Sequence, residues 1–313
     1  MQNQNLAAID LGTNSCRLLI ADSDGNRLFK TAISTRMGEG MSANNCFTEA
    51  AIKRGIDCFC EFRRKMDEYG VQKYRAIATA ACRMSENGTE FVETVRKTAN
   101  INLEVIDGYE EARLNLLGAI SNAENSNAEY VIVYDLGGGS TEITLATKEL
   151  TPRILHTVSI PWGARNSSEK FEINEYDAAK AANLAAEISK YSRKFVVDAG
   201  LEKYRDKLCF IATSSTSLRL AHLARDWKVY ERERADGEVV TTEEFDRGIA
   251  QVRNMTFDER LNDTRIGASR ADIFNAACVI FSQIYRDLGA KEIVTSFKSA
   301  VEGIITELKD GAN

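Results

Sequence analysis

The feature that most constrains the fold of this chain is a glycine-rich strand pair that occurs twice. From Tyr130 the sequence reads YVIVYDLGGGSTEI, in which an apolar run ends on Asp135 and three glycines lead into a second apolar run. From Leu6 it reads LAAIDLGTNSCRLLIA, and Asp10 aligns with Asp135 at an offset of 125 residues. Apolar runs on both sides of a short polar turn predict two strands joined by a hairpin. Because about one domain length separates the hairpins, the repetition predicts a duplicated fold of two lobes.

Each turn has the composition of a phosphate-binding loop. Glycine adopts positive φ without steric cost, and successive N–H groups in such a turn form a concavity that favours an anion. The predicted phosphate-binding residues are Gly12, Thr13, Asn14 and Ser15 in the first turn and Gly137, Gly138, Gly139, Ser140 and Thr141 in the second. The carboxylates of Asp135 and Glu142 would repel a bare phosphate, so the pattern indicates a divalent metal between them and the anion. One such turn also suits an ordinary hairpin, but two of them favour an anion held between the lobes.

The composition excludes several other classes of protein. With 313 residues, 44% of them apolar and 27% charged, the chain is typical of a soluble globular protein large enough for two cores. The net charge of −6 argues against a nucleic-acid polymer as partner, because binding to backbone phosphates requires clustered Lys and Arg. No apolar run approaches the ~20 residues of a membrane span, and the start lacks a basic, apolar leader. We therefore expect a cytoplasmic protein without a membrane partner.

The cysteines and histidines, which are the residue types that bind soft metals, show no pattern typical of a metal site. The seven cysteines are scattered and form no CxxC pair, which predicts free thiols in a reducing compartment. His156 and His222 lie far apart in the sequence and have no recognisable ligand spacing. A histidine-based nucleophile or metal centre is therefore not expected.

Charged side chains at three places outside the hairpins are candidates for the site. Arg36 lies in a predicted loop over residues 35–45, which can close over a substrate or simply lie on the surface. Arg83 follows a predicted strand and therefore lies at the carboxyl edge of a sheet, where ligands bind in α/β folds. Glu110 and Glu111 fall at the start of a predicted helix, where the helix dipole stabilises a carboxylate. Beside a phosphate site, such a carboxylate can also orient and deprotonate water.

The domain boundary is predicted in the polar stretch NAENSNAE, at residues 122–129. An N-terminal lobe is expected over residues 1–124 and a C-terminal lobe over residues 125–302, with a helix at about 303–313 that can pack back on the first lobe. Each lobe opens with three predicted strands in a meander, followed by helices that alternate with strands. This order predicts an α/β fold with a mixed sheet in each lobe.

This arrangement resembles the actin-like ATPase superfold, and within it the exopolyphosphatase/guanosine pentaphosphate phosphatase (Ppx/GppA) family. Four blocks carry the resemblance: AAIDLGTNSCRLLIA from Ala7, ATAACR from Ala78, VIDGYEEARLNLLGA from Val105 and VYDLGGGSTEI from Val133. They occur in the order that the family has, and the resemblance covers essentially the whole chain. The resemblance implies two ribonuclease-H-like lobes, each with a mixed five-stranded sheet and flanking helices, and a cleft between them.

The resemblance also implies roles for individual residues. Glu111, the second glutamate of the EEAR block, would be the general base that acts on water. Asp135, with Glu142, would coordinate Mg²⁺, and Asp10 is a further candidate ligand. Arg83 and Arg36 would contact the trailing phosphates of the substrate. A homodimer is expected from the same resemblance.

The implied activity is Mg²⁺-dependent release of terminal orthophosphate from inorganic polyphosphate, with a preference for short chains. The resemblance leaves two alternatives open. One is hydrolysis of the 5′-terminal phosphate of guanosine pentaphosphate, and the other is a sensor that binds guanosine tetraphosphate or polyphosphate with little catalysis.

Three positions depart from the family pattern. Ser215-Thr216 stands where the family has Gly-Thr, Ala276 and Ala277 stand near the usual Pro-Gly, and Val301 replaces an arginine. A side chain at Ser215 weakens the expectation of a bound nucleoside, because glycine there lets the backbone approach the ligand. The chain resembles the short, two-domain form of the family, which has less surface for a long polymer.

Overall fold

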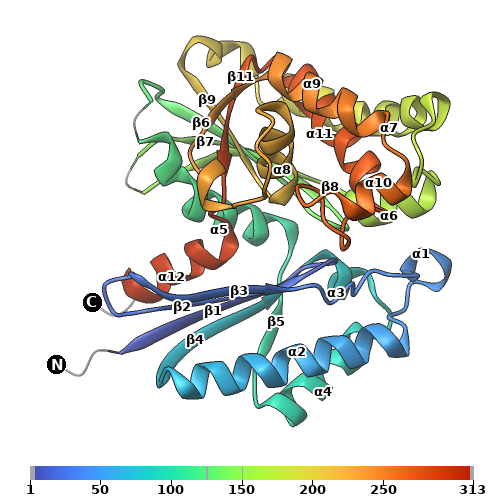
Figure 1. The fold of residues 1–313 in the computed structure, drawn as a ribbon. Coiled ribbons are helices and arrows are strands. Elements are labelled where there is room, and N and C mark those ends of the chain that lie inside the picture. Colours follow the sequence, from blue (N-terminus) through green and yellow to red (C-terminus); the bar gives the residue numbers. More distant parts are fainter. Residues whose placement is uncertain (1–3, 125, 150, 311–313) are drawn as a thin grey trace. The chain divides into compact units, whose positions relative to one another are not determined.

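A computed structural model describes residues 4–124, 126–149 and 151–310 of the chain (Figure 1). The chain divides into two compact units: the first unit is Met1–Gly118 together with Ala300–Asn313, and the second unit is Ala119–Ser299. Each unit is built on one mixed sheet with flanking helices, which confirms the predicted α/β class. Residue 125, the predicted start of the second lobe, and residues 311–313 of the predicted last helix lie outside the described residues.

The first unit repeats the expected meander and then adds parallel strands. Its strands are β1 (Asn5–Leu11), β2 (Cys16–Ala21), β3 (Arg27–Ile33), β4 (Val71–Ala78) and β5 (Leu103–Val105), in the order β3-β2-β1-β4-β5. Its helices are α1 (Met41–Asn44), α2 (Glu49–Glu68), α3 (Ala80–Met84), α4 (Gly88–Ala99), α5 (Gly108–Ala119) and α12 (Ala300–Asp310). The central strand β1 is antiparallel to β2 and parallel to β4.

Helices cover both faces of the first sheet. Because successive side chains of a strand point to opposite faces, Ile9 packs in a core with α2, whereas Ala8 packs in a core with α12. Helix α12 comes from the far end of the chain, and it also packs against α5. A Cβ atom on Gly303 of α12 would overlap the carbonyl oxygen of Leu114 in α5, so only glycine permits this close approach.

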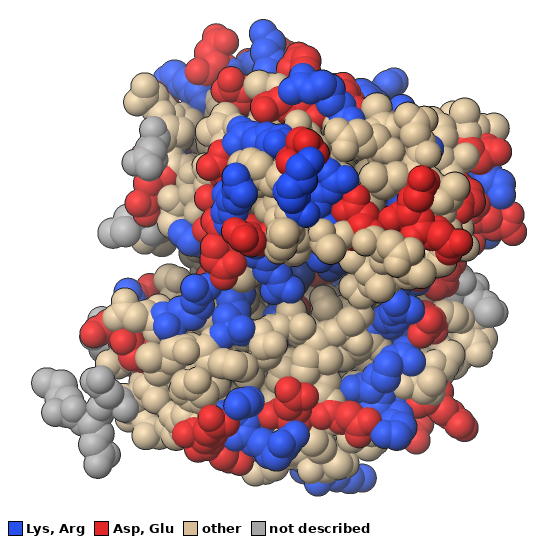
Figure 2. All heavy atoms as spheres, in the orientation of Figure 1, with Lys and Arg blue, Asp and Glu red and all other residues tan. Residues whose placement is uncertain are grey.

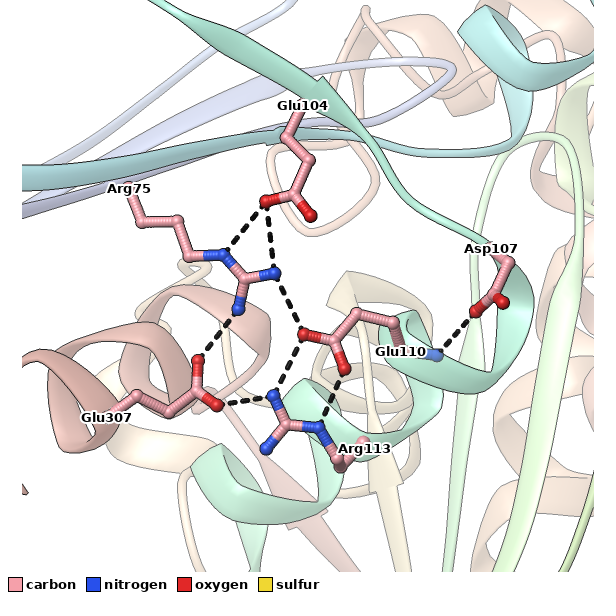
Figure 3. Close-up of polar contacts among 6 residues, drawn as sticks. All are labelled: Arg75, Glu104, Asp107, Glu110, Arg113 and Glu307. Carbon is pink, nitrogen blue, oxygen red and sulfur yellow. Dashed lines mark hydrogen bonds and ion pairs between the residues drawn. The ribbon is translucent and has the colours of Figure 1, made fainter. Parts of the chain in front are cut away.

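An ion-pair network joins β4, β5, α5 and α12 (Figure 3). Arg75 of β4 donates to Glu110 at 2.8 Å, to Glu307 at 2.8 Å and to Glu104 at 3.1 Å. Arg113 of α5 donates to Glu110 at 2.7 Å and also to Glu307. The network thus ties β4 and the C-terminal α12 to the neighbouring elements β5 and α5.

This network predicts a loss of stability in acid. The hydrogen bond from Arg113, followed by that from Arg75, lowers the pKa of Glu110 from its ordinary value. The folded pKa is therefore below the unfolded value of about 4.3. The stabilisation is fully present above pH 4.3 and is lost as the pH falls through the folded pKa.

The substitution Glu110→Gln is expected to lower the free energy of unfolding by about 1 kcal/mol at pH 7, because the network is partly exposed. The difference from the wild type should be smaller at pH 3 than at pH 7, because the stabilisation is lost as the pH falls through the lowered pKa of Glu110. Urea unfolding at the two pH values measures both quantities, with the exposed Glu61 of α2 as the control position (Glu61→Gln). A difference that does not depend on pH would contradict the charged role of Glu110.

The second unit has the same strand order with one addition. Its strands are β6 (Tyr130–Leu136), β7 (Thr141–Thr147), β8 (Ile154–Ile160), β9 (Leu208–Thr213), β10 (Val239–Thr241) and β11 (Glu292–Ser296), in the order β10-β11-β9-β6-β7-β8. Its helices are α6 (Ala164–Lys170), α7 (Ala178–Asp198), α8 (Ser215–Ala224), α9 (Thr242–Arg253), α10 (Phe257–Asn262) and α11 (Phe274–Leu288), and its 3₁₀ segments are η1 (Ile120–Ala123), η2 (Leu201–Lys203), η3 (Arg205–Lys207) and η4 (Glu233–Ala235). The order β8-β7-β6-β9-β11 reproduces β3-β2-β1-β4-β5 of the first unit.

The prediction of five strands in the second sheet is wrong, because β10 pairs antiparallel with β11 as a sixth strand. This strand has three residues, too few for a periodic pattern, and Thr241 at its end also caps α9. Thr241 and Glu244 form a capping box at the start of α9, with Glu244 N–H donating to Thr241 Oγ1 at 3.2 Å.

Two further expectations concern the whole chain. All seven cysteines lie in the described residues and are free thiols, as predicted. Among the helices that the structure describes, none is both long enough and apolar enough to span a bilayer.

Candidate functional site

The two glycine-rich hairpins form the same turn. Gly12 N–H donates to the Ser15 carbonyl at 3.0 Å, and Gly137 N–H donates to the Ser140 carbonyl at 3.0 Å. A Cβ atom would lie 3.3 Å from that oxygen at Gly12 and 3.0 Å from it at Gly137. Both contacts are tight for a side chain, which gives a physical reason for glycine at these two aligned positions.

Helix α6 orients the glycine turn of the second unit. The first groups of α6 donate to the carbonyls of the turn: Ala164 N–H to Gly137 at 2.9 Å, Arg165 N–H to Gly138 at 2.7 Å and the Asn166 side chain to Gly139 at 2.9 Å. Because the N–H and C=O groups of a peptide point in opposite directions, the N–H groups that share these peptides point away from α6. Successive N–H groups with this orientation suit an anion.

Gly163, the residue before α6, lies against this turn. A Cβ atom at position 163 would be 2.5 Å from the carbonyl carbon of Gly138, closer than any side chain can lie. Gly163 N–H also donates to the Asn166 side chain at 2.8 Å. The conformation of the glycine turn therefore depends on a residue from a different segment.

A row of polar side chains crosses the second sheet beside the turn. Asp135 of β6 is the register partner of Glu142 on β7 and of Thr213 on β9. Glu142 is in turn opposite Ser159 of β8, whose hydroxyl donates to Glu142 Oε1 at 2.7 Å, and Thr213 is opposite Ser296 of β11. Register partners point to the same face, so the row presents two buried carboxylates next to each other with hydroxyls on both sides.

The corresponding row of the first sheet has a different charge. Asp10 is the register partner of Arg17, the residue that aligns with Glu142, and of Ile77, which stands at the place of Thr213. Arg17 Nη1 donates to Asp10 Oδ2 at 2.7 Å. The first sheet therefore balances its carboxylate with a guanidinium, whereas the second sheet pairs two carboxylates. Of the two rows, the second has the donor set of a hard divalent cation.

Glu111 lies on α5 in the first unit and is 7% exposed. Leu114, one turn later on the same helix, packs in the core formed by α12 and the face of β1 that also carries Asp10. Arg83 Nη1 lies 3.4 Å from Glu111 Oε2 and donates to the Ile106 carbonyl at 2.7 Å. The structure therefore brings together two of the predicted site residues, Arg83 and Glu111.

Arg36 is held close to the first turn by the backbone. Arg36 N–H donates to the Asn14 carbonyl at 3.0 Å, and Gly38 N–H donates to the Thr13 carbonyl at 2.9 Å. The Arg36 guanidinium lies 3.7 Å from Glu39. The prediction of a loop throughout 35–45 is wrong at its end, because Met41–Asn44 forms the single turn α1, closed by the N–H of residue 45.

Sequence reasoning missed two residues that shape the second turn and its carboxylates. Gly163 was visible only as a turn glycine in the segment IPWGA, and Ser159 only as one residue of a strand. Their partners, Gly138 and Glu142, are 25 and 17 residues earlier, and only strand register and the packing of α6 bring them together.

The comparisons with known proteins place this geometry in a family. A profile of the Ppx/GppA phosphatase family matches residues 19–311. Bifunctional 3-dehydroquinate synthase/phosphatase from Fusobacterium nucleatum is 28% identical over 96% of the chain, and the chain spans only 46% of the length of that protein. Exopolyphosphatase 2 from Mycobacterium tuberculosis is 25% identical over 97% of the chain and 98% of its own length.

A solved structure gives the same result for the fold. The crystal structure of an exopolyphosphatase from Cytophaga hutchinsonii has a TM-score of 0.86 and 24% identity, and the match covers 98% of each chain. The duplicated hairpins, the paired sheet orders and the family profile over nearly the whole length agree. The chain therefore belongs to the Ppx/GppA phosphatase family, with the actin-like fold that its sequence predicted.

Proposed function

We propose that the protein is an exopolyphosphatase, which releases terminal orthophosphate from inorganic polyphosphate with the help of Mg²⁺. The main observation behind this proposal is a buried pair of carboxylates, Asp135 and Glu142, which flank a glycine turn suited to phosphate. Family membership supports a phosphatase, and the relatives named as exopolyphosphatases support this substrate class.

The residues present fit a magnesium ion. Two adjacent carboxylates repel each other unless a cation lies nearby, and Mg²⁺ prefers carboxylate oxygens and phosphate oxygens. Asp135 and Glu142 would hold the ion, which would neutralise charge on the phosphate oxygens when bound. Asp10 already contacts Arg17, so its role as a metal ligand stays a prediction. The homodimer also stays a prediction.

The chain's own residues would position the reactants. The N–H groups of residues 12–15 and 137–141 would bind oxygens of the terminal phosphoryl group. Glu111 would orient a water molecule and accept its proton while the water oxygen bonds to phosphorus. The bridging P–O bond then breaks, and the electron pair leaves with the shortened chain. Arg83 and Arg36 would contact the trailing phosphates.

A substrate panel tests the proposal directly. Release of orthophosphate should be measured from tripolyphosphate, long-chain polyphosphate and guanosine pentaphosphate at equal phosphate concentration. The proposal expects a higher kcat/KM for the inorganic chains than for the nucleotide. The second candidate is hydrolysis of guanosine pentaphosphate. It is supported by relatives in the same family that are named guanosine-5′-triphosphate,3′-diphosphate pyrophosphatases. A strong preference for the nucleotide would replace the first proposal with the second.

The metal is tested with a carboxylate variant. Asp135→Asn keeps the side-chain size but removes one charged donor, so the Mg²⁺ concentration for half-maximal rate is expected to rise at least about tenfold. Chelation by EDTA should abolish turnover by the wild type, and added Mg²⁺ should restore it. Asp177→Asn, at the exposed cap of α7, is the control. An unchanged Mg²⁺ dependence in Asp135→Asn would exclude this residue as a ligand.

A further inference from the structure

We propose that the second unit contains a further anion subsite, formed by Arg219, Arg232 and Tyr230, that binds the trailing phosphates of a polyphosphate chain. The proposal rests on the proposed function for the identity of the anion. The side chains that form it, however, do not include Asp135 or Glu111.

Arg219 of α8 is a buried cation without a counter-ion. It is 9% exposed, and its Nη1 donates to the Arg265 carbonyl at 2.6 Å. Its Nε is buried without a hydrogen-bond partner, and no carboxylate among the described residues lies within ion-pair distance. The other buried arginines of the described chain, Arg165 and Arg260, both have carboxylate partners. A buried charge is costly unless it is paired, so Arg219 has the environment of a group that awaits an anion.

The surroundings of Arg219 add cationic and hydroxyl groups. The guanidinium carbon lies 3.8 Å from the centre of the Tyr230 ring, and the Tyr230 hydroxyl is buried without a partner. Arg232, on the segment before η4, lies over the Phe297 ring at 5.7 Å and has no ion-pair partner among the described residues. Burial lowers the pKa of Arg219, Tyr230 acts in the opposite direction, and the charge on Arg232 lowers this pKa further.

Two acidic side chains close to Arg265 are engaged with other basic side chains. Asp263 binds Arg265 at 2.6 Å, and Asp226 binds both Lys228 at 2.7 Å and Arg265 at 3.5 Å. Figure 2 shows that Lys and Arg side chains gather, with acidic side chains among them, over the part of the second unit where Figure 1 places α8. Neither of these two aspartates forms an ion pair with Arg219 or Arg232.

A line of unpartnered hydroxyls leads from the polar row to Arg219. Thr213, the register partner of Asp135, is 1% exposed, and its Oγ1 has no partner. Ser215 Oγ, in the first turn of α8, is also buried without a partner. Ser215 and Arg219 are four residues apart and lie on one face of α8, separated by about 6 Å along the axis.

The backbone between these hydroxyls is strained. Ser214 has φ 106° and ψ 157°, a conformation that non-glycine residues rarely adopt and that is found mostly at functional sites. Its side chain accepts a hydrogen bond from Thr216 N–H at 3.3 Å. The strain thus falls at the turn that presents the two unpartnered hydroxyls.

An extended chain of phosphates fits this arrangement better than a nucleoside does. The Tyr230 ring already covers one face of the Arg219 guanidinium, so the base of a nucleoside cannot stack on that face. The N–H edge is the part that binds phosphate oxygens. The hydroxyls of Thr213 and Ser215 are followed by the guanidinium groups of Arg219 and Arg232. Such a series of donors suits an anion that carries negative charge along its whole length.

The test compares substrates of different length. Arg219→Gln and Arg232→Gln are expected to raise KM for long-chain polyphosphate roughly tenfold or more. KM for tripolyphosphate and kcat for both substrates should stay within about twofold, because the terminal phosphoryl is bound elsewhere. Arg219→Lys should restore part of the affinity for the long chain. Arg193→Gln on α7, whose side chain is 73% exposed, is the control and should change neither KM.

Several outcomes would overturn the subsite. These are an unchanged KM for long chains in both folded variants, an equal rise for short and long chains, or weaker binding of guanosine pentaphosphate alone. Arg232 is partly exposed, so Arg232→Gln keeps the test decisive if Arg219→Gln does not fold. Calorimetric binding of long-chain polyphosphate without Mg²⁺ separates this proposal from the proposed function. A wild type that binds the polymer more tightly than Arg232→Gln, but hydrolyses none, would retain the subsite and reject the exopolyphosphatase.

Discussion

Glu111→Gln is expected to reduce kcat by about 10²- to 10⁴-fold, the range that general-base assistance contributes. The substitution keeps the shape of a buried side chain but removes its ability to accept a proton from water. KM should change little, because the phosphate-binding turns are unaltered. Steady-state rates of phosphate release at saturating polyphosphate and Mg²⁺ measure the effect.

The neighbouring residue provides a matched control for this experiment. Glu110→Gln changes the same functional group one position earlier on α5, but the Glu110 carboxylate binds Arg75 and Arg113. It should therefore lower stability while kcat stays within about twofold at a temperature where the protein is folded. If Glu111→Gln retained a near wild-type rate, or if both variants lost activity equally, Glu111 would not be the base.

Gly163→Ala is expected to lower kcat/KM at least about a hundredfold. The added Cβ atom would lie 2.5 Å from the carbonyl carbon of Gly138, and backbone on both sides leaves no flexible group that can move aside. The glycine turn must shift, and a displacement of about 1 Å at a positioning group can cost about 10²-fold in rate. Overpacking of this kind also destabilises by roughly 1–3 kcal/mol. Phosphate release and thermal unfolding should both be measured.

A second glycine separates the local effect from general destabilisation. Gly237 has φ +77° and nothing within 4 Å of an added Cβ atom, so Gly237→Ala strains the backbone without disturbing the turn. We expect a lower melting temperature and an unchanged kcat/KM. Full activity of Gly163→Ala would show that the contact between α6 and the turn is not needed for catalysis.

Local sequence patterns predicted most of the elements. Apolar alternation and the repeated Asp-Leu-Gly motif located both hairpins, because strand and turn preferences act over a few residues. Threonine is a residue type that favours helix caps, and Thr48 and Thr241 each accept a backbone hydrogen bond at the start of their helix. The strand β10 was missed because a strand of three residues has no period to detect.

The site was predictable only in part. The turns, Asp135, Glu142 and Glu111 could be proposed from motifs that lie within short segments. The partners of these groups could not, because Ser159 reaches Glu142 through strand register and Gly163 reaches Gly138 through the packing of α6. The sequence also does not show that Arg219 lacks a counter-ion. An unpaired guanidinium is unusual only when it is buried, and burial is a property of the tertiary structure.

The sequence by itself determined a duplicated α/β chain with two phosphate-type turns, because glycine conformation and strand periodicity are local properties. Only the tertiary structure decided which side chain each of the two aligned aspartates meets. Aligned positions hold Arg17 in one sheet and Glu142 in the other, and each acts on the aspartate that strand pairing places opposite it. Asp10 therefore meets a guanidinium at 2.7 Å, while Asp135 meets a second carboxylate. The physical reason is that electrostatic partners are set by cross-strand register, which no single segment of sequence contains.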